Sequence, residues 1–557
     1  MKYGYRSLFT AVVIISIAGL FSQCSSRHNA THKPKLVVGI VVDQMRWDFL
    51  YRYSDKYSAN GFKRLLNGGY SCANTHINYI PSYTGPGHSC IYTGSVPAIH
   101  GIAGNNWYDR DRNTSLYCVE DSTESRTGDG VLKGNISPRN LLVTTITDEL
   151  RLATNFKSKV IALALKDRSS VLPGGHTSNA AYFFDGKAGN FVTSTYYMKK
   201  LPDWVTTFND KKLPAKYLSA NWSTLLPIEK YVESTADDNL FERKFKGEDH
   251  PAFVHNISEI AKKSPEIIAA TPFGNSLTLD FAKAAIEGEK LGSGKATDFL
   301  AISLSSTDYI GHQFGPNSVE VEDCYLRLDK DIASFLAYLD EKVGKDNYLV
   351  FLTADHGAAH VPGFLEQDDI RIPSGRFDAD TTIKLLNAAL KEKFGGAKPW
   401  ISSGLNMQLY MDRDQLNKGE QDKKATRKEI FTFVKGFLMK FDGVANVVDL
   451  EDVSSSSLQG NLKTLVSNGY NPKRSGDFQI IYNPGWIEDE PGIATTHGTA
   501  YPYDTHIPLI WYGWKVKHGE DHADVHMTDI APTLAAMLHI QEPDGCVGKV
   551  INGVQGK

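Results

Sequence analysis

The sequence has few cysteines, and none of them form closely spaced pairs. Its 557 residues include six, at positions 24, 72, 90, 118, 324 and 546, and no two of these are separated by only two residues. Zinc sites built from thiolates use such pairs, so this class of site is disfavoured. The spacing leaves open which of these thiols, if any, pair as disulfides.

A strong net charge is also lacking. The 60 basic and 64 acidic residues leave a formal charge of only −4, with no broad excess of basic residues. We therefore expect no nucleic-acid partner. Since the overall field is weak, an anionic ligand has to be attracted by local charges and metal ions.

Long apolar runs are absent after the N-terminus, and crossing a bilayer as a helix takes about 20 apolar residues. Lys2 and Arg6 precede an uncharged apolar run over residues 8–21, which predicts a signal peptide over residues 1–23 and an exported, periplasmic protein. Cys24 lies where a bacterial lipoprotein carries its lipid. Lipidation with outer-membrane anchoring and ordinary signal cleavage both remain open, and membrane contact is expected only through that lipid.

Short apolar runs rich in β-branched residues indicate the fold. Helical patterns lie between them, over residues 318–343 and from Thr528 to Met537. Fully apolar runs are typical of parallel strands buried under helices. We therefore predict an α/β sandwich, with a mostly parallel central sheet covered by helices on both faces. The predicted strands are Leu36–Val42, Val160–Leu165, Phe299–Leu304, Tyr348–Thr353 and Ile507–Tyr512.

Two segments interrupt this rhythm within a single domain over residues 34–557. Residues 185–275 are rich in Trp, Tyr, Lys and Pro with weak periodicity, which predicts a surface insertion. Residues 369–477 contain helical patterns and two predicted strands, Leu405–Tyr410 and Val444–Leu450. We interpret this second segment as an inserted α+β cap.

Residues that can bind metals follow several predicted strands, at the edge where open α/β sheets bind ligands. One Asp at a strand end is usually a turn or cap residue, but a set of three Asp and three His is enough for two cations with three ligands each. Two cations about 4 Å apart suit phosphoryl transfer. The set is Asp43, Asp308, His312, Asp355, His356 and His497.

A candidate nucleophile lies in the segment Pro81–Ser89, just before a helical pattern. Thr84 offers a hydroxyl there, and a helix N-terminus would add backbone donors for a phosphate. Coordination to a dication would lower the pKa of this hydroxyl, so no separate base is needed. The alternative, in which Thr84 or Ser82 only caps the helix, remains open at this point.

The order of these residues, with Thr84 in a Thr-x-Pro-x-His setting, resembles the alkaline phosphatase superfamily. The resemblance covers nearly the whole mature chain and lies in the Thr-nucleophile branch shared with nucleotide pyrophosphatases. Within it, the phosphate-irrepressible alkaline phosphatases of the PafA type are the most similar. The sulfatase branch is disfavoured because the chain has no Cys-x-Pro-x-Arg or Ser-x-Pro-x-Arg motif.

The resemblance implies hydrolysis of phosphate monoesters, with small phosphorylated metabolites as substrates. It also implies a covalent phosphothreonine intermediate at Thr84 and two zinc ions. One zinc would be bound by Asp308, His312 and His497, and the other by Asp43, Asp355 and His356, with Thr84 bound to the second.

Three further residues match this subgroup: Asn105, Lys166 and Arg168. The resemblance implies that the Asn105 amide holds a phosphate oxygen and that the two cations lie over the transferred phosphoryl group. A monoester dianion exposes one more charged oxygen than a diester, so two extra cations favour monoesters. On its own, the Lys166-Asp167-Arg168 segment could equally be a solvated turn.

Two rival functions remain open. A phosphodiesterase or nucleotide pyrophosphatase would use the same metals and Thr84, and a surface lipoprotein could bind zinc or phosphate without turnover. Other histidines, at positions 88, 100, 176 and 506, are expected to pack or to support the site rather than to bind metal.

Overall fold

The structure, a computed structural model, describes residues 33–367 and 370–555. The predicted signal peptide and Cys24 lie outside the described residues. None of the helices in the described part of the chain combines the length and the apolar character that a membrane crossing requires.

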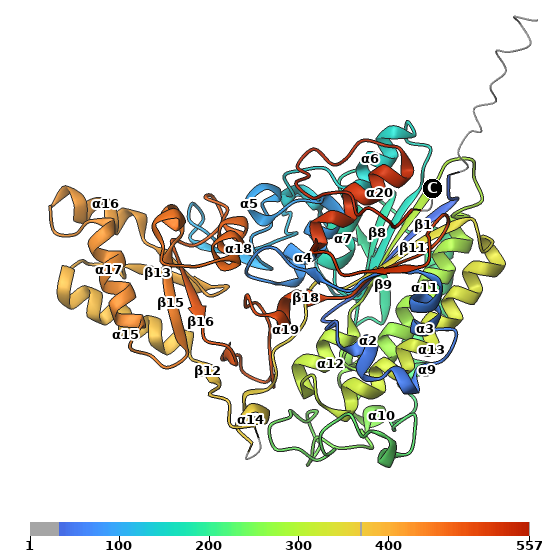
Figure 1. Cartoon of the computed structure of the whole chain (residues 1–557), viewed down its shortest axis with the longest axis horizontal. Coiled ribbons are helices and arrows are strands. Elements are labelled where there is room, and N and C mark those ends of the chain that lie inside the picture. Colours follow the sequence, from blue (N-terminus) through green and yellow to red (C-terminus); the bar gives the residue numbers. More distant parts are fainter. Residues whose placement is uncertain (1–32, 368–369, 556–557) are drawn as a thin grey trace, which may run out of the picture.

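A ten-stranded sheet forms the centre of the molecule (Figure 1). Its middle strands, from β11 to β8 in the order below, run parallel, and the strands at both edges are antiparallel or mixed. The order is β20 (Gly519–Asp521), β2 (Tyr70–Cys72), β19 (Leu509–Gly513), β11 (Tyr348–Thr353), β1 (Leu36–Val42), β10 (Asp298–Leu304), β7 (Val160–Ala164), β8 (Ala180–Asp185), β9 (Asn190–Ser194) and β6 (Arg126–Thr127).

Helices cover both faces of this sheet because its central strands are apolar on both sides. Every residue of β1, β10 and β11 is buried. One face carries α11 (Phe273–Glu289), α12 (Ser306–Phe314) and α13 (Val319–Lys342), and the other carries α4 (Thr84–Thr93), α7 (Arg168–Gly174) and α20 (Ile530–Leu538) (Figure 1). The predicted fold class is therefore confirmed.

The predicted parallel strand over Ile507–Tyr512 is wrong in two respects. Pro508 divides it into β18 (His506–Ile507), which pairs with β3 (Thr75–His76), and β19. β19 runs antiparallel to β11, with Leu349 opposite Gly513. Apolar composition reports burial but not strand direction, and proline has no N–H to donate to a ladder.

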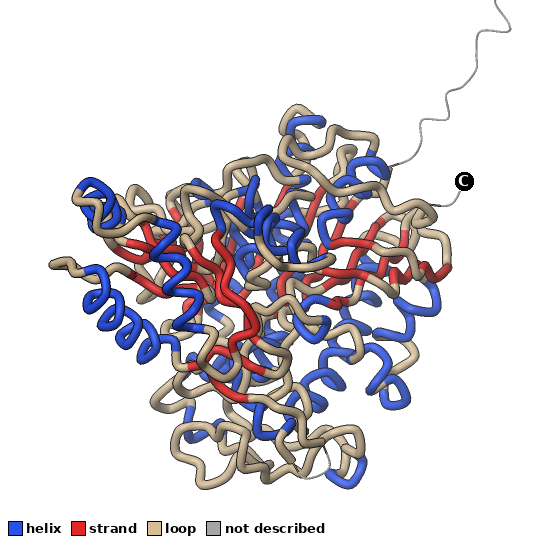
Figure 2. The backbone as a smooth tube through the Cα atoms, turned by 60° about the vertical axis from the view of Figure 1, so that its left-hand side comes forward, coloured by secondary structure: helices blue, strands red, loops and turns tan. Residues whose placement is uncertain are grey.

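Residues 375–488, from β12 (Gly375–Phe377) to β17 (Trp486–Glu488), form a smaller layer with its own apolar core, which we call the cap. Its helices pack beside a four-stranded sheet, at the left of Figure 1 and again in Figure 2. The main helices are α15 (Ala379–Phe394), α16 (Arg413–Gln421) and α17 (Arg427–Leu438), and the sheet order is β13 (Ile401–Leu405), β14 (Gln408–Met411), β16 (Phe478–Tyr482) and β15 (Val444–Asp449).

The predicted cap strand over Leu405–Tyr410 is wrong, because a hairpin turn divides it. Asn406 and Met407 both have positive φ angles, 59° and 58°, and they connect β13 to β14. Because Met rarely adopts a positive φ angle, the composition of residues 405–410 does not indicate a turn.

The segment around residues 185–275 begins inside the main sheet, because β9 pairs with β8. The chain then packs short helices against α11, and side chains of the following loop, Trp222 and Tyr231, donate to Asp323 of α13. The α-helices of this segment are α8 (Asp203–Asp210), α9 (Leu213–Tyr217) and α10 (Ile257–Ile260).

Candidate active site

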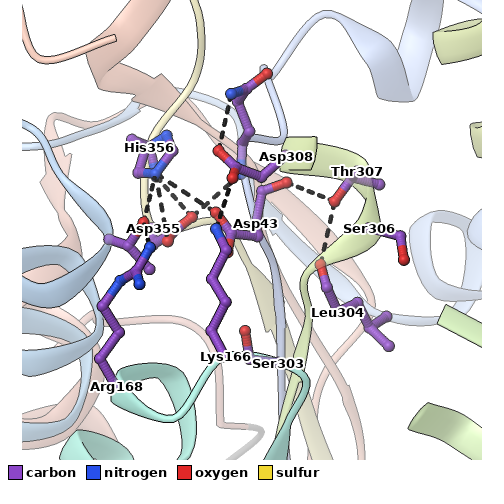
Figure 3. A network of polar contacts seen from close by, with 12 residues as sticks. Asp43, Lys166, Arg168, Ser303, Leu304, Ser306, Thr307, Asp308, Asp355 and His356 are labelled. Atoms are coloured by element: carbon purple, nitrogen blue, oxygen red, sulfur yellow. Dashed lines mark hydrogen bonds and ion pairs between the residues drawn. The ribbon is translucent and has the colours of Figure 1, made fainter. Parts of the chain in front are cut away.

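Residues that follow the carboxyl ends of β1, β10 and β11, namely Asp43, Asp308, Asp355 and His356, meet at one place (Figure 3). His312 joins them from α12, and His497 joins them from the loop after β17 (Trp486–Glu488). Donor atoms of Asp308, His312 and His497 all lie within 4.8 Å of one another, and so do those of Asp43, Asp308 and His356. The carboxylate of Asp355 joins the second group, with Oδ2 3.5 Å from His356 Nε2. All six predicted residues thus meet at one place.

Each of the three histidines has its ring fixed by a backbone carbonyl. The Nδ1–H groups donate to backbone oxygens, which leaves every Nε2 atom free to bind a cation. The pairs are His312 with Thr495 at 2.8 Å, His356 with Gly357 at 3.0 Å, and His497 with Ser82 at 2.7 Å.

Two buried carboxylate oxygens in this site, Asp43 Oδ1 and Asp355 Oδ2, have no hydrogen-bond partner. Burial, followed by the charges of Asp308 and Asp355, raises the pKa of Asp43 well above its usual value even though Lys166 Nζ lies 2.6 Å from Asp43 Oδ2. Unpaired buried carboxylate oxygens are costly unless an ion satisfies them. The donors present therefore fit divalent cations.

The site's electrostatics favour the metal-binding protonation state of Asp308 and His497, whereas the raised pKa of Asp43 favours its acid form. Burial acts to lower the pKa of His312, but the charge of Asp308 outweighs it and raises that pKa. Burial acts to raise the pKa of Asp308, but His312 and Lys166 outweigh it and hold that pKa well below its usual value. Burial and the neighbouring His356 and His312 lower the pKa of His497 well below its usual value, so its imidazole is neutral at pH 7. Ionised carboxylates and neutral imidazoles are the metal-binding forms.

Thr84 is the first residue of α4, and its hydroxyl faces the cluster. Its Oγ1 lies 3.4 Å from His356 Nε2 and 3.5 Å from Arg168 Nη2. The capping alternative is wrong: the N-cap residue is Tyr83, no side chain caps this helix, and the Ser82 hydroxyl donates to the Thr499 carbonyl. The Thr84 hydroxyl is therefore available for chemistry.

Lys166 and Arg168 approach the same cluster from the end of β7 (Figure 3). Lys166 Nζ lies 2.6 Å from both Asp43 Oδ2 and Asp308 Oδ2. Asp167 caps α7, and Arg168 Nη1 donates to the Tyr117 hydroxyl at 3.3 Å. These contacts exclude the alternative of a solvated turn.

Asn105 lies beside the nucleophile, because its Oδ1 accepts the Gly85 backbone N–H at 2.8 Å. This bond fixes the amide and leaves its NH₂ group free to donate. The cap reaches the neighbouring loop, where Asn406 Nδ2 donates to the Asn106 carbonyl at 2.7 Å. The cap turn therefore helps to position the loop that carries Asn105.

Two residues, His88 and Gln44, support the site through contacts that the sequence analysis did not predict. His88 Nδ1 lies 3.0 Å from the Thr84 carbonyl and 3.3 Å from Asp355 Oδ2. Gln44 Nε2 donates to Asp308 Oδ1 at 2.8 Å. The sequence signal for His88 is its place in the Thr-x-Pro-x-His motif, one turn after Thr84, and that for Gln44 is its position directly after Asp43.

The other three histidines have partners elsewhere. His100 lies against the Cys90 thiol, His176 contacts the Asp148 carboxylate, and His506 contacts the Ala73 carbonyl.

Comparisons with known proteins agree with this geometry. The type I phosphodiesterase / nucleotide pyrophosphatase family matches residues 37–503. A Myroides odoratus protein named calcium-transporting ATPase is 52% identical over 98% of both chains. Alkaline phosphatase PhoV of Synechococcus elongatus is 50% identical, covering 93% of this chain and 92% of its own. The crystal structure of alkaline phosphatase PafA is 49% identical, with a TM-score of 0.91, and the match covers 95% of this chain and all of the other.

These similarities extend over nearly the whole chain and through the site. The chain therefore belongs to the type I phosphodiesterase / nucleotide pyrophosphatase family and stands among its alkaline phosphatases.

Proposed function

We propose that this protein hydrolyses phosphate monoesters to an alcohol and inorganic phosphate, with Thr84 as the nucleophile. The observation that carries this proposal is the position of the Thr84 hydroxyl. It lies at a helix N-terminus, within 3.5 Å of both His356 in the buried carboxylate–imidazole cluster and the guanidinium of Arg168.

Two zinc ions are the cofactors that best suit the donors. Asp308, His312 and His497 would hold one ion, and Asp43, Asp355 and His356 would hold the other beside Thr84. Mixed nitrogen and oxygen donors in groups of three are typical of catalytic zinc. When bound, the ions lower the pKa of the Thr84 hydroxyl and offset charge on the attacking and leaving oxygens.

The chain's own residues then orient the substrate, and the reaction proceeds in two steps. Thr84 Oγ1 attacks phosphorus, the bond to the leaving oxygen breaks, and a phosphothreonine forms with release of the alcohol. Water hydrolyses this intermediate, releases inorganic phosphate and restores the hydroxyl. The free Asn105 amide and the Arg168 guanidinium donate to phosphoryl oxygens throughout.

Lys166 adds the charge that separates monoesters from diesters. Its ammonium reaches the carboxylates of Asp43 and Asp308, so it lies inside the site. It can turn to a phosphoryl oxygen once cations neutralise those carboxylates. A dianionic monoester benefits more from this positive charge than a monoanionic diester does.

A direct assay tests this function. Purified protein should hydrolyse 4-nitrophenyl phosphate much faster than bis(4-nitrophenyl) phosphate, and a chelator should abolish both activities. Faster diester hydrolysis would favour the phosphodiesterase alternative, which the family description keeps open. Binding of zinc or phosphate without turnover of either substrate would favour a binding protein.

We infer from the sequence that the protein is exported, through a signal peptide over residues 1–23, and that Cys24 is the candidate for a lipid anchor. The intact mass of the mature protein decides between lipidation and simple cleavage. A mature N-terminus before residue 20 or an uncleaved chain would contradict the inference.

A further inference from the structure

A second group of buried acids lies outside the active site. In the described residues, two of the buried carboxylate oxygens without a hydrogen-bond partner belong to Asp43 and Asp355. Three more belong to Asp237 (Oδ1), Glu242 (Oε2) and Glu320 (Oε2), which we call the acidic cluster. The same feature that marks the metal centre is therefore repeated here. Within residues 33–367 and 370–555, one more such oxygen exists, Oδ1 of Asp504, whose Oδ2 accepts two hydrogen bonds from Thr499.

Two segments far apart in the sequence bring the acidic cluster together. The Thr235 N–H donates to the Asn317 carbonyl at 2.8 Å, and the Arg243 N–H donates to the Gln313 carbonyl at 2.9 Å. The segment 235–243 is thereby held along the connection between α12 and α13. Glu320 lies in the first turn of α13 and is fully buried, and Glu242 is 6% exposed.

The acidic cluster has too little positive charge around it. His255 is its nearest cationic partner, with Nε2 3.1 Å from Glu320 Oε1, but its Nδ1 already contacts Glu248 at 3.1 Å. Burial and the charge of Glu320 raise the pKa of Glu242 to about 10, and burial raises that of Glu320 to about 7. The charge of Glu320 therefore opposes ionisation of Glu242, and a bound cation would offset this cost.

We propose that Asp237, Glu242 and Glu320 form a binding site for a hard divalent cation, calcium. All three offer oxygen, which calcium prefers, whereas zinc favours nitrogen and sulfur donors. Calcium accepts six to eight ligands in irregular geometry, which suits a loop, while magnesium demands a near-ideal octahedron.

Glu242 and Glu320 form the centre of this site, and the half-buried Asp237 completes it. Among the described residues, only the active-site groups bring three donor atoms within 4.8 Å of one another. Asp237 must therefore turn inward or bind through water, and water fills the remaining positions.

A cation here would support the catalytic centre without touching substrate. It would fasten the segment 235–243 to the α12–α13 connection, and α12 carries Asp308 and His312. Calcium should therefore raise the melting temperature of the zinc-loaded protein and slow the loss of zinc to a chelator.

Calorimetric titration of the zinc-loaded protein with calcium chloride tests the proposal. We expect one calcium per chain beyond the zinc, with a dissociation constant below about 1 mM, in the range of extracellular calcium sites. Glu242→Gln and Glu320→Gln keep the side-chain shape but remove a charge, and each should weaken calcium binding at least about 10-fold. Magnesium should bind more weakly than calcium.

The matched control is Glu488→Gln in the cap, because burial raises the pKa of Glu488 to about 7 as well. This variant should bind calcium like the wild type. Failure of the wild type to bind calcium at 10 mM would overturn the proposal, whether or not the variants fold, and would indicate that Glu242 and Glu320 share a proton. Equal calcium affinity in wild type and both cluster variants would also overturn it.

Discussion

Thr84 shows at the scale of one residue how position makes a weak nucleophile useful. Its hydroxyl is buried and not needed for capping, and it lies within 3.5 Å of both His356 and Arg168. Replacing it by alanine should abolish the covalent intermediate, whereas Thr84→Ser should keep part of the activity because a hydroxyl remains. Acid quenching during turnover, followed by intact mass, measures the phosphoenzyme. A phosphorylated Thr84→Ala protein would place the nucleophile elsewhere.

Lys166 and Arg168 should decide between monoesters and diesters. Loss of one charge-assisted hydrogen bond costs about 1.5–3 kcal/mol, or about 10- to 150-fold in rate if it acts in the transition state. The double change to alanine should therefore lower monoester kcat/KM by about two to four orders of magnitude, with some non-additivity because both residues share one phosphate.

Diester hydrolysis by the same variant should fall far less. The two substrates need the same leaving group and a rate limited by chemistry, since a diffusion-limited monoester would hide part of the loss. Equal losses on both substrates at unchanged zinc content would show that these cations do not select monoesters.

The candidate ligands were easier to predict from the sequence than the residues that contact and orient them. Aspartates at strand ends and histidines among small residues carry a recognisable pattern, so the six candidate ligands and Thr84 could be named as candidates from the residues themselves. Asn105, Lys166 and Arg168 were named from the family resemblance. His88 and Gln44 could not be assigned partners, because their contacts with Asp355 and Asp308 join positions more than 260 residues apart in the chain. Such contacts depend on how strands are ordered in the sheet.

At the scale of elements, the nucleophile helix α4 must approach the end of β11 closely. A Cβ atom on Gly87 would lie 2.5 Å from the Asp355 carbonyl oxygen and 2.8 Å from its Cβ, so only glycine fits there. Gly87→Ala should push α4 away from Asp355 and lower kcat/KM by about 10- to 100-fold, since small misplacements of reacting groups are costly. Steady-state kinetics and zinc content measure this effect.

Gly436→Ala is the matched control, because Gly436 lies within α17 and nothing lies within 4 Å of the added Cβ. This change should leave activity unaltered and stabilise the protein by about 0.4–1 kcal/mol. A Gly87→Ala enzyme with normal activity would mean that α4 can shift without disturbing the site.

Element boundaries were predictable where the local pattern decides them. The predicted strand Leu36–Val42 matches β1, and the pattern over residues 318–343 corresponds to α13, capped by Ser318. The direction of β19 and the turn at Asn406 and Met407 were not predictable. Strand direction follows from the path of the preceding chain, and a positive φ at Met is imposed by the surrounding hairpin.

At the scale of the whole molecule, the candidate metal site joins parts of the chain from Asp43 to His497. Lys166 contacts two of its three aspartates, Asp43 and Asp308. Asp43, Asp308 and Asp355 are buried together, so removing the ions should destabilise the main domain as well as inactivate it. A ligand at 1,000 times its dissociation constant stabilises the native state by about 4 kcal/mol.

Dialysis against a chelator should therefore abolish turnover and lower the melting temperature by several degrees. Zinc should restore both, and magnesium alone should restore neither, because nitrogen donors suit zinc better. Full activity after prolonged chelation, with zinc verified as absent, would refute the metal assignment.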